Sequence, residues 1–129
     1  MKKIIPIILS TLLLAGCAAE TKENTYRQVG MEEAMAIMEQ ESGYVILDVR
    51  RIDEFAEKHI PGAINIPNEE IGDEPIPQLP DKDQLILVYC RSGNRSKQAS
   101  EKLVALGYTN VVEFGGINDW PGEVVSGAE

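Results

Sequence analysis

Residues 85–96 read Leu85-Ile86-Leu87-Val88-Tyr89-Cys90-Arg91-Ser92-Gly93-Asn94-Arg95-Ser96, and this stretch decides the fold. The run from Leu85 to Tyr89 is continuously apolar, which is typical of a short strand buried on both faces of a sheet. A helix is expected from Ser96 to Leu106, because apolar residues recur there at helical spacing and Gly107 follows as a stop signal. The order strand, loop, helix predicts an α/β domain.

The loop between this strand and helix carries the candidate chemistry. Cys90 lies at the carboxyl end of the strand, which is where ligands bind in parallel α/β sheets. Gly93 and Asn94 can adopt the positive φ values of a tight cradle, whose inward N–H groups would favour a thiolate or an anion. Arg91 and Arg95 add positive charge in a chain that is otherwise acidic. The loop therefore predicts an activated thiol that meets a small anionic substrate.

A purely structural interpretation of these residues is the alternative. Cys90 would then be a small buried hydrophobic residue that closes the strand, and Arg91 and Arg95 would be surface charges. The Arg, Ser, Gly and Asn residues around Cys90 favour the nucleophile. The one histidine, His59, is a candidate base, but its context Lys-His-Ile-Pro-Gly indicates a packing or turn residue.

The rest of the chain continues the α/β pattern. Apolar residues at helical spacing predict a helix over 31–41, with its methionines in the core, and Asp53 is a candidate cap for a short helix over 53–58. Short apolar runs predict strands at 44–47, 63–66 and 111–114, and the proline-rich segment 67–80 is expected to be a solvated loop with at most one helical turn. We therefore expect an α/β domain around a mostly parallel sheet, with Asp48 and Cys90 both at carboxyl ends of strands.

Composition excludes several classes of protein. The chain has 129 residues, which suits one hydrophobic core and one domain. It carries 21 acidic and 12 basic side chains, a formal net charge of −9, so the electrostatic attraction that nucleic-acid binding needs is missing. Any anion site must be built locally. A monomer is the default expectation.

The first residues are expected to form a targeting signal. Lys2-Lys3 precede an apolar run from Ile4 to Leu14, and Ala15-Gly16-Cys17 follow. The run is much shorter than the ~20 residues that a transmembrane helix needs. Leu14-Ala15-Gly16-Cys17 resembles the bacterial lipoprotein lipobox, although an ordinary signal with an incidental Cys17 is the alternative. The resemblance implies a signal peptide over 1–16, a lipid on Cys17 and export to the extracytoplasmic side of an envelope membrane.

Residues 18–25 are small and polar, so segment 17–25 is expected to be a lipidated tether and the domain is expected to span 26–125. If Cys17 carries lipid, Cys90 is the remaining one of the two cysteines. No intrachain disulfide and no Cys-based metal cluster can then form. We expect neither a metal nor a cofactor.

From Tyr26 to Trp120 the sequence resembles the single-domain rhodaneses. Four pieces carry this resemblance and occur in the family's order: Leu47-Asp48-Val49-Arg50 with Glu54-Phe55, His59-Ile60-Pro61-Gly62-Ala63-Ile64-Asn65, Tyr89-Cys90-Arg91-Ser92-Gly93-Asn94-Arg95-Ser96, and Gly115-Gly116 with Trp120. Lys58 departs from the family, many of whose members have Gly before the His. The resemblance implies a three-layer α/β/α domain with a central, mostly parallel sheet of about five strands.

The resemblance also implies a sulfurtransferase. Cys90 would take the outer sulfur of a donor such as thiosulfate, hold it as a persulfide and pass it to cyanide or a thiol. The loop residues Arg91, Ser92, Gly93, Asn94, Arg95 and Ser96 would bind the anionic donor. Asp48 would hold an arginine and Arg50 would line the entrance, unless the two only form a salt bridge that fixes the fold.

Three other functions stay open at this point. Phosphatases and arsenate reductases of this fold have one more residue between Cys and Arg, so the smaller loop here favours sulfur over phosphate. A rhodanese-like binding module usually lacks the Cys that this chain keeps. In a relay, Cys90 would pass sulfur or redox equivalents to an exported partner.

Overall fold

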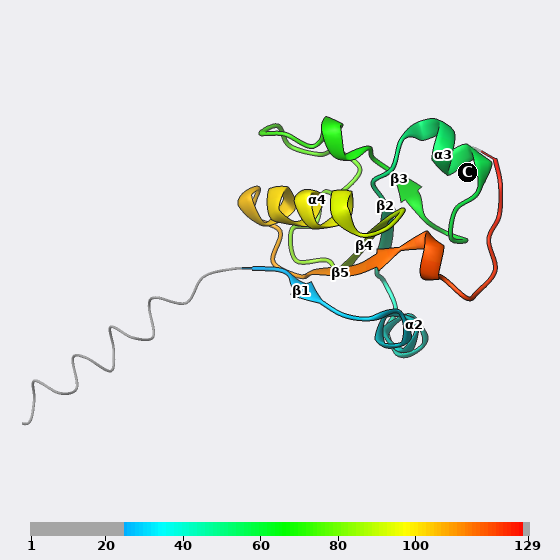
Figure 1. Ribbon diagram of the computed structural model, residues 1–129. Coiled ribbons are helices and arrows are strands. Elements are labelled where there is room, and N and C mark those ends of the chain that lie inside the picture. The colour runs from blue at the N-terminus through cyan, green and yellow to red at the C-terminus, as the bar shows by residue number, and fades with distance from the viewer. Residues whose placement is uncertain (1–24, 128–129) are drawn as a thin grey trace, which may run out of the picture.

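Five strands form one parallel sheet in the computed structural model, which describes residues 25–127 (Figure 1). The strands lie in the order β1-β5-β4-β2-β3, and every neighbouring pair is parallel. Their bounds are β1 Arg27–Gln28, β2 Val45–Asp48, β3 Ile64–Asn65, β4 Ile86–Cys90 and β5 Val111–Gly116. Strand β4 is central in this order, and its residues pack into core clusters on both faces of the sheet, as the apolar run that precedes Cys90 predicts.

Helices cover both faces of this sheet (Figure 1). Helix α4, Asn94–Ala105, packs on one face together with the short turn η1, Asn68–Glu70. Helices α2, Met31–Gln40, and α3, Ile52–Glu57, pack on the other face, near the turn η2, Ile117–Asp119. The three-layer α/β/α architecture and the five-stranded parallel sheet confirm the predicted fold class.

The alternation of strand β4 fills both layers of the core. Ile86 and Val88 point to the layer that contains Leu103 of α4, whereas Leu87 and Tyr89 point to the layer that contains Phe55 of α3. All five residues of β4 are buried. Burial of a large apolar side chain contributes about 1.5–3 kcal/mol, so this strand fixes the position of the residue at its end.

Several element boundaries differ from the prediction. Helix α4 begins at Asn94, two residues before the expected start at Ser96. Helix α3 begins at Ile52 with Arg51 as its N-cap, so the prediction of Asp53 as the cap is wrong. Asp53 lies in the first turn instead, where a carboxylate also favours the helix. Strand β1 was not expected from the sequence.

The predicted signal peptide at 1–16, the lipid site at Cys17 and tether residues 18–24 lie outside the described residues. Between residues 25 and 127, no helix is both long enough and apolar enough to cross a membrane.

Candidate functional site

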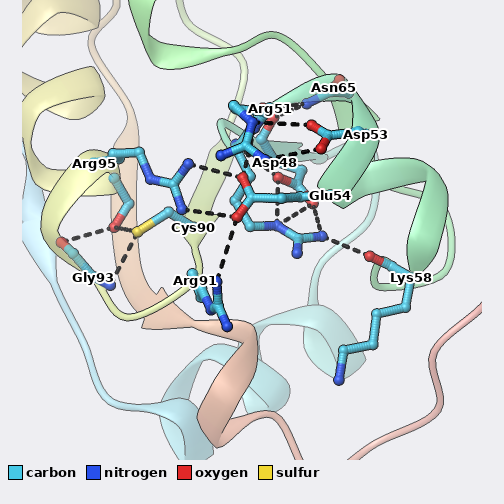
Figure 2. A network of polar contacts seen from close by, with 12 residues as sticks. Asp48, Arg51, Asp53, Glu54, Lys58, Asn65, Cys90, Arg91, Gly93 and Arg95 are labelled. Carbon is cyan, nitrogen blue, oxygen red and sulfur yellow. Dashed lines mark hydrogen bonds and ion pairs between the residues drawn. The ribbon is translucent and has the colours of Figure 1, made fainter.

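Cys90 is the last residue of β4, and its side chain is held at the start of the loop that leads to α4 (Figure 2). The residue is 1% exposed. The backbone N–H of Gly93 donates a hydrogen bond to Cys90 Sγ at 3.0 Å, and Ser96 Oγ lies 3.4 Å from the same sulfur. The Gly93 N–H therefore donates to the sulfur, and Sγ in turn donates to Ser96 Oγ. A backbone donor aimed at the sulfur is suited to holding negative charge on it.

The loop turns at Gly93, which adopts a φ of 110° and precedes the first residue of α4. Asn94 does not share this conformation, contrary to the expectation that both residues could be left-handed, because it already belongs to the helix. The first turn of α4 has N–H groups without intrahelical partners, and they face the loop end of the helix. Ser92 and Asn94 are exposed, whereas Ser96 is buried.

Gly116, at the end of β5, packs directly against this loop. A Cβ atom built on Gly116 would lie 2.0 Å from the carbonyl oxygen of Arg91 and 2.6 Å from the backbone nitrogen of Ser92. The backbone N–H of Asn118 also donates to the Arg91 carbonyl at 3.2 Å. The end of β5 therefore packs against the backbone of the Cys90 loop, and a side chain at Gly116 would displace this loop.

Both arginines of the loop face Glu54 of α3 (Figure 2). Arg95 forms an ion pair with Glu54, with Nη1 to Oε1 at 2.8 Å, and Arg91 Nη1 lies 3.9 Å from Glu54 Oε2. The hydrogen bond from Arg95 holds the pKa of Glu54 at about 2, although burial acts in the opposite direction. Glu54 was not expected in the site. It compensates part of the positive charge that the sequence assigned to the loop.

Asp48 and Arg50, expected beside the loop, form a buried ion pair. Arg50 Nη2 lies 2.8 Å from Asp48 Oδ2 and also donates to the carbonyl of Lys58 at 2.6 Å. Burial lowers the pKa of Arg50, but the hydrogen bond and charge of Asp48 outweigh burial and raise it. The pair fixes the end of β2, and Arg50 also lines a cavity beside the Cys90 loop.

This cavity has a volume of about 290 Å³ and lies between α3, the Cys90 loop and η2. Its charged lining comprises three cations and two carboxylates, and the full lining is Arg50, Glu54, Glu57, Lys58, Arg91, Ile117 and Asn118. Arg91 is the loop arginine that lines it, and its side chain is 65% exposed. The cavity therefore lies beside the Cys90 loop, at Arg91, and is large enough for a small anion.

Glu113 is the second site residue that the sequence analysis missed. It is buried in β5, and Ser96 Oγ contacts its Oε2 in a short hydrogen bond. A charged residue inside the otherwise apolar run 111–114 was the signal that could have found it.

His59 is away from the loop chemistry and inside the core. Its ring stacks on Phe55 with centroids 3.7 Å apart, and its Nδ1 lies 2.8 Å from the Phe55 carbonyl oxygen. These contacts agree with a packing residue. Within the part of the chain that the structure describes, no group of three or more His, Cys, Asp and Glu side chains could hold a metal ion.

This chain is similar to known proteins in both sequence and fold. The family model described as Rhodanese-like domain matches residues 31–123, and the model described as Prokaryotic membrane lipoprotein lipid attachment site matches residues 1–18. Thiosulfate sulfurtransferase PspE of Escherichia coli (strain K12) is 41% identical over 73 residues, which cover 57% of this chain and 70% of that protein.

A second similar sequence and a similar solved structure point to the same family. Thiosulfate sulfurtransferase GlpE of Pseudomonas savastanoi pv. phaseolicola is 34% identical over 107 residues, covering 79% of this chain and 97% of that protein. A solved structure described as a rhodanese with anions from E. coli superposes with a TM-score of 0.60 at 38% identity, covering 65% of this chain and 99% of that one. The family model alone matches more than half of the chain, and the loop of Cys90 lies within the match. The chain therefore belongs to the rhodanese-like family.

Proposed function

We propose that this rhodanese-like sulfurtransferase uses Cys90 as its nucleophile and takes the outer sulfur of thiosulfate or a similar anionic donor. The observation that carries the proposal is the Cys90 sulfur at the end of β4, with the Gly93 N–H 3.0 Å from it. Relatives named thiosulfate sulfurtransferases support the choice of donor. No cofactor is needed for this chemistry.

The transfer has two steps. The Cys90 thiolate attacks the outer sulfur of thiosulfate, the bond between the two donor sulfurs breaks, and sulfite leaves with the electron pair. Cys90 then carries a persulfide anion, which the N–H of Gly93 and the start of α4 can stabilise. Cyanide or a thiolate next attacks the terminal sulfur of the persulfide and leaves Cys90 as a thiolate.

The cavity beside the loop is the proposed site for the anionic end of the donor. Arg91 is the loop cation that lines this cavity, and it lies 3.9 Å from Glu54, whereas Arg95 and Arg50 each contact a carboxylate at 2.8 Å. We therefore assign long-range attraction and contact with the donor to Arg91. The other loop residues are assigned to the shape of the loop: Ser92, Gly93, Asn94, Arg95 and Ser96. Asp48 and Arg50 are assigned to the support of the cavity wall.

We further propose that residues 1–16 are a signal peptide, that Cys17 carries lipid and that residues 17–25 tether a domain spanning 26–125. The match to a lipoprotein lipid attachment site at residues 1–18 supports lipid anchoring to a membrane. Placement on the extracytoplasmic side and a monomeric state complete this proposal.

Intact mass spectrometry of the purified protein after incubation with thiosulfate tests the role of Cys90. The expected result is a gain of about one sulfur, roughly 32 Da, that disappears when cyanide is added. Cys17→Ser is the matched control and should keep the adduct, whereas Cys90→Ser should lose it. A folded, reduced protein without an adduct would contradict thiosulfate as the donor. A persulfide that cyanide does not remove would contradict cyanide as an acceptor.

A further inference from the structure

The cavity beside the Cys90 loop is lined by two charged residues that the sulfur-transfer steps above do not use, Glu57 and Lys58. Glu57 is the last residue of α3, and Lys58 follows it as the C-cap of this helix. Both residues are exposed, and within residues 25–127 neither forms an ion pair, with the other or with a third residue. Figure 2 shows the Lys58 side chain extending away from the Glu54 carboxylate.

The other charged residues of this cavity are compensated within the protein. Arg50 lies 2.8 Å from Asp48. Glu54 lies 2.8 Å from Arg95 and 3.9 Å from Arg91. One positive and one negative side chain of the lining therefore keep their charge for a ligand.

A cation and a carboxylate at consecutive positions are complementary to a zwitterion. An α-amino acid carries its carboxylate and its ammonium on the same carbon atom, so the carboxylate can bind Lys58 while the ammonium binds Glu57. A zwitterion has no net charge, and the formal net charge of −9 on the chain does not repel it at long range as it repels an anion. The charges of the cavity therefore favour an amino-acid group.

The size of the cavity also favours a ligand larger than cyanide. Its volume of about 290 Å³ is about ten times the ~30 Å³ that one water molecule occupies in the liquid. A diatomic cyanide ion fills only a small part of this space, whereas a thiol of amino-acid size fits within it. Arg91, which directly follows Cys90, belongs to the same lining. A thiol held by Glu57 and Lys58 can therefore extend its sulfur along Arg91 toward the loop.

We propose that Glu57 and Lys58 recognise the amino-acid end of the sulfur acceptor, and that the acceptor is a small thiol with an α-amino-acid group. The inference rests on the proposed function, because it names the class of acceptor for the Cys90 persulfide. Glu57 and Lys58 determine specificity by binding the acceptor away from its reacting sulfur. They do not act on the persulfide itself.

Sulfur transfer to such a thiol is balanced. The acceptor thiolate forms a bond with the outer sulfur of the Cys90 persulfide, the bond between that sulfur and Cys90 breaks, and Cys90 keeps the electron pair. The acceptor leaves as its own persulfide anion, and Cys90 is again a thiolate. No separate oxidant or reductant takes part, because one thiolate passes the sulfur to another.

Discharge of the Cys90 persulfide by three related thiols tests this inference. L-Cysteine carries both charges, 3-mercaptopropionate carries only the carboxylate, and cysteamine carries only the ammonium. The full chain is loaded with thiosulfate, separated from excess donor and mixed with each thiol. Intact mass spectrometry then follows the loss of about one sulfur, roughly 32 Da. Dividing the rate constant of a variant by that of the wild type cancels the intrinsic reactivity of each thiol.

Each substitution should slow only the thiols that carry the complementary charge. Lys58→Gln should slow discharge by L-cysteine and by 3-mercaptopropionate about three- to fivefold and should not slow discharge by cysteamine. Glu57→Gln should slow discharge by L-cysteine and by cysteamine to a similar extent and should not slow discharge by 3-mercaptopropionate. L-Cysteine is therefore the thiol that both substitutions slow.

Lys97→Gln and Glu39→Gln are the matched controls. They remove the same charges from exposed positions on α4 and α2, outside the cavity lining, and should leave all three rates as in the wild type. Equal slowing of all three thiols by Lys58→Gln, unchanged rates in both cavity variants, or the same pattern in Lys97→Gln would overturn the recognition of an amino-acid group.

Failure of thiosulfate to load Cys90 would contradict the proposed donor, and binding alone then decides the inference. Chemical-shift titration by NMR uses S-methyl-L-cysteine, which has the amino-acid group but no thiol. Weaker binding to Lys58→Gln than to Lys97→Gln would support the inference. Equal binding to the two variants would overturn it.

Discussion

Arg95 and Glu54 are 41 positions apart in the sequence, yet they form a 2.8 Å ion pair at the edge of the Cys90 loop. This pair joins the first turn of α4 to α3 and thereby links the two layers that enclose the end of β4 (Figure 2). Glu54 Oε1 also accepts the backbone N–H of Arg51 at 2.9 Å, a contact that caps the N-terminus of α3. One carboxylate thus stabilises a helix end and restrains a loop arginine.

Acid should weaken the protein through Glu54. The Arg95 hydrogen bond lowers the pKa of Glu54 from 4.5 to about 2, so the folded state binds this proton less readily than the unfolded chain does. For a lowered pKa, the stabilisation is complete above pH 4.5 and is lost as the pH falls toward 2. We expect the urea midpoint of the wild type to fall over this range.

Glu54→Gln should have a lower urea midpoint at pH 6 and a smaller further loss between pH 4.5 and pH 2 than the wild type. Glu39→Gln, which removes an exposed acid on α2, should follow the wild-type curve. Parallel acid profiles for Glu54→Gln and the wild type would show that Glu54 does not carry this pH dependence.

Arg91 should control the affinity for the anionic donor. The chain has a formal net charge of −9, so a dianion approaches against a repulsive field and depends on local cations. Arg91→Ala should raise KM for thiosulfate about tenfold, which corresponds to ~1.4 kcal/mol, and should change kcat much less. Steady-state kinetics at low and high salt measure this effect, which should shrink as salt screens the charge.

Arg27→Ala is the control for Arg91, because the two arginine side chains are similarly exposed, 63% and 65%, but Arg27 lies on β1 outside the cavity. Its KM should equal that of the wild type. An equal increase in both variants would assign the effect to overall charge and not to contact with the donor.

The sequence was sufficient to predict the elements that local patterns specify. The run before Cys90 is apolar at every position because β4 is covered on both faces, and this pattern predicted a buried strand with the thiol at its carboxyl end. Strand β1 carries no comparable pattern. Its residues Arg27 and Gln28 are both exposed. The strand is defined by its pairing with β5, whose residues Val112 and Glu113 lie far along the chain.

The polar partners of the loop could not be predicted for a similar reason. Glu54 meets Arg95, and Glu113 meets Ser96, only after the strand order brings β5 and α3 to the end of β4. Spacing along the chain does not encode these contacts. The loop arginines were therefore predicted only as cations for the donor, whereas in the folded protein both face the Glu54 carboxylate, Arg95 at 2.8 Å and Arg91 at 3.9 Å.

The buried pair of Asp48 and Arg50 should be essential for stability. Their side chains are 0% and 4% exposed, so Asp48→Asn leaves a buried guanidinium with reduced compensation. Loss of one partner of a buried ion pair costs about 3–5 kcal/mol. Urea denaturation at pH 7 should show a decrease of this size in the free energy of unfolding.

The exposed pair of Arg51 and Asp53 supplies the control for Asp48→Asn. It has the same N–O distance of 2.8 Å and the same spacing of two residues, but both side chains are more than half exposed. Asp53→Asn should therefore leave the urea midpoint close to that of the wild type. Similar losses in the two variants would mean that burial does not set the contribution of the pair.

Gly116→Ala should separate the fold from the activity. The added Cβ would lie 2.0 Å from the carbonyl oxygen of Arg91 and 2.3 Å from its carbonyl carbon, and backbone atoms cannot yield as a flexible side chain can. The loop must therefore move, and with it the Gly93 N–H that contacts Cys90 Sγ. A displacement of about 1 Å at a reacting group can cost about 10²-fold in rate, so persulfide formation should slow by up to this factor.

Gly72→Ala is the control, because it adds the same methyl group where no atom lies within 4 Å, and it should retain the wild-type rate. Far-UV circular dichroism should stay native in both variants, because the sheet pairings of β4 and β5 between Ile86–Val88 and Val111–Glu113 lie outside the clash. Wild-type activity in Gly116→Ala would show that the position of the loop is not set by β5.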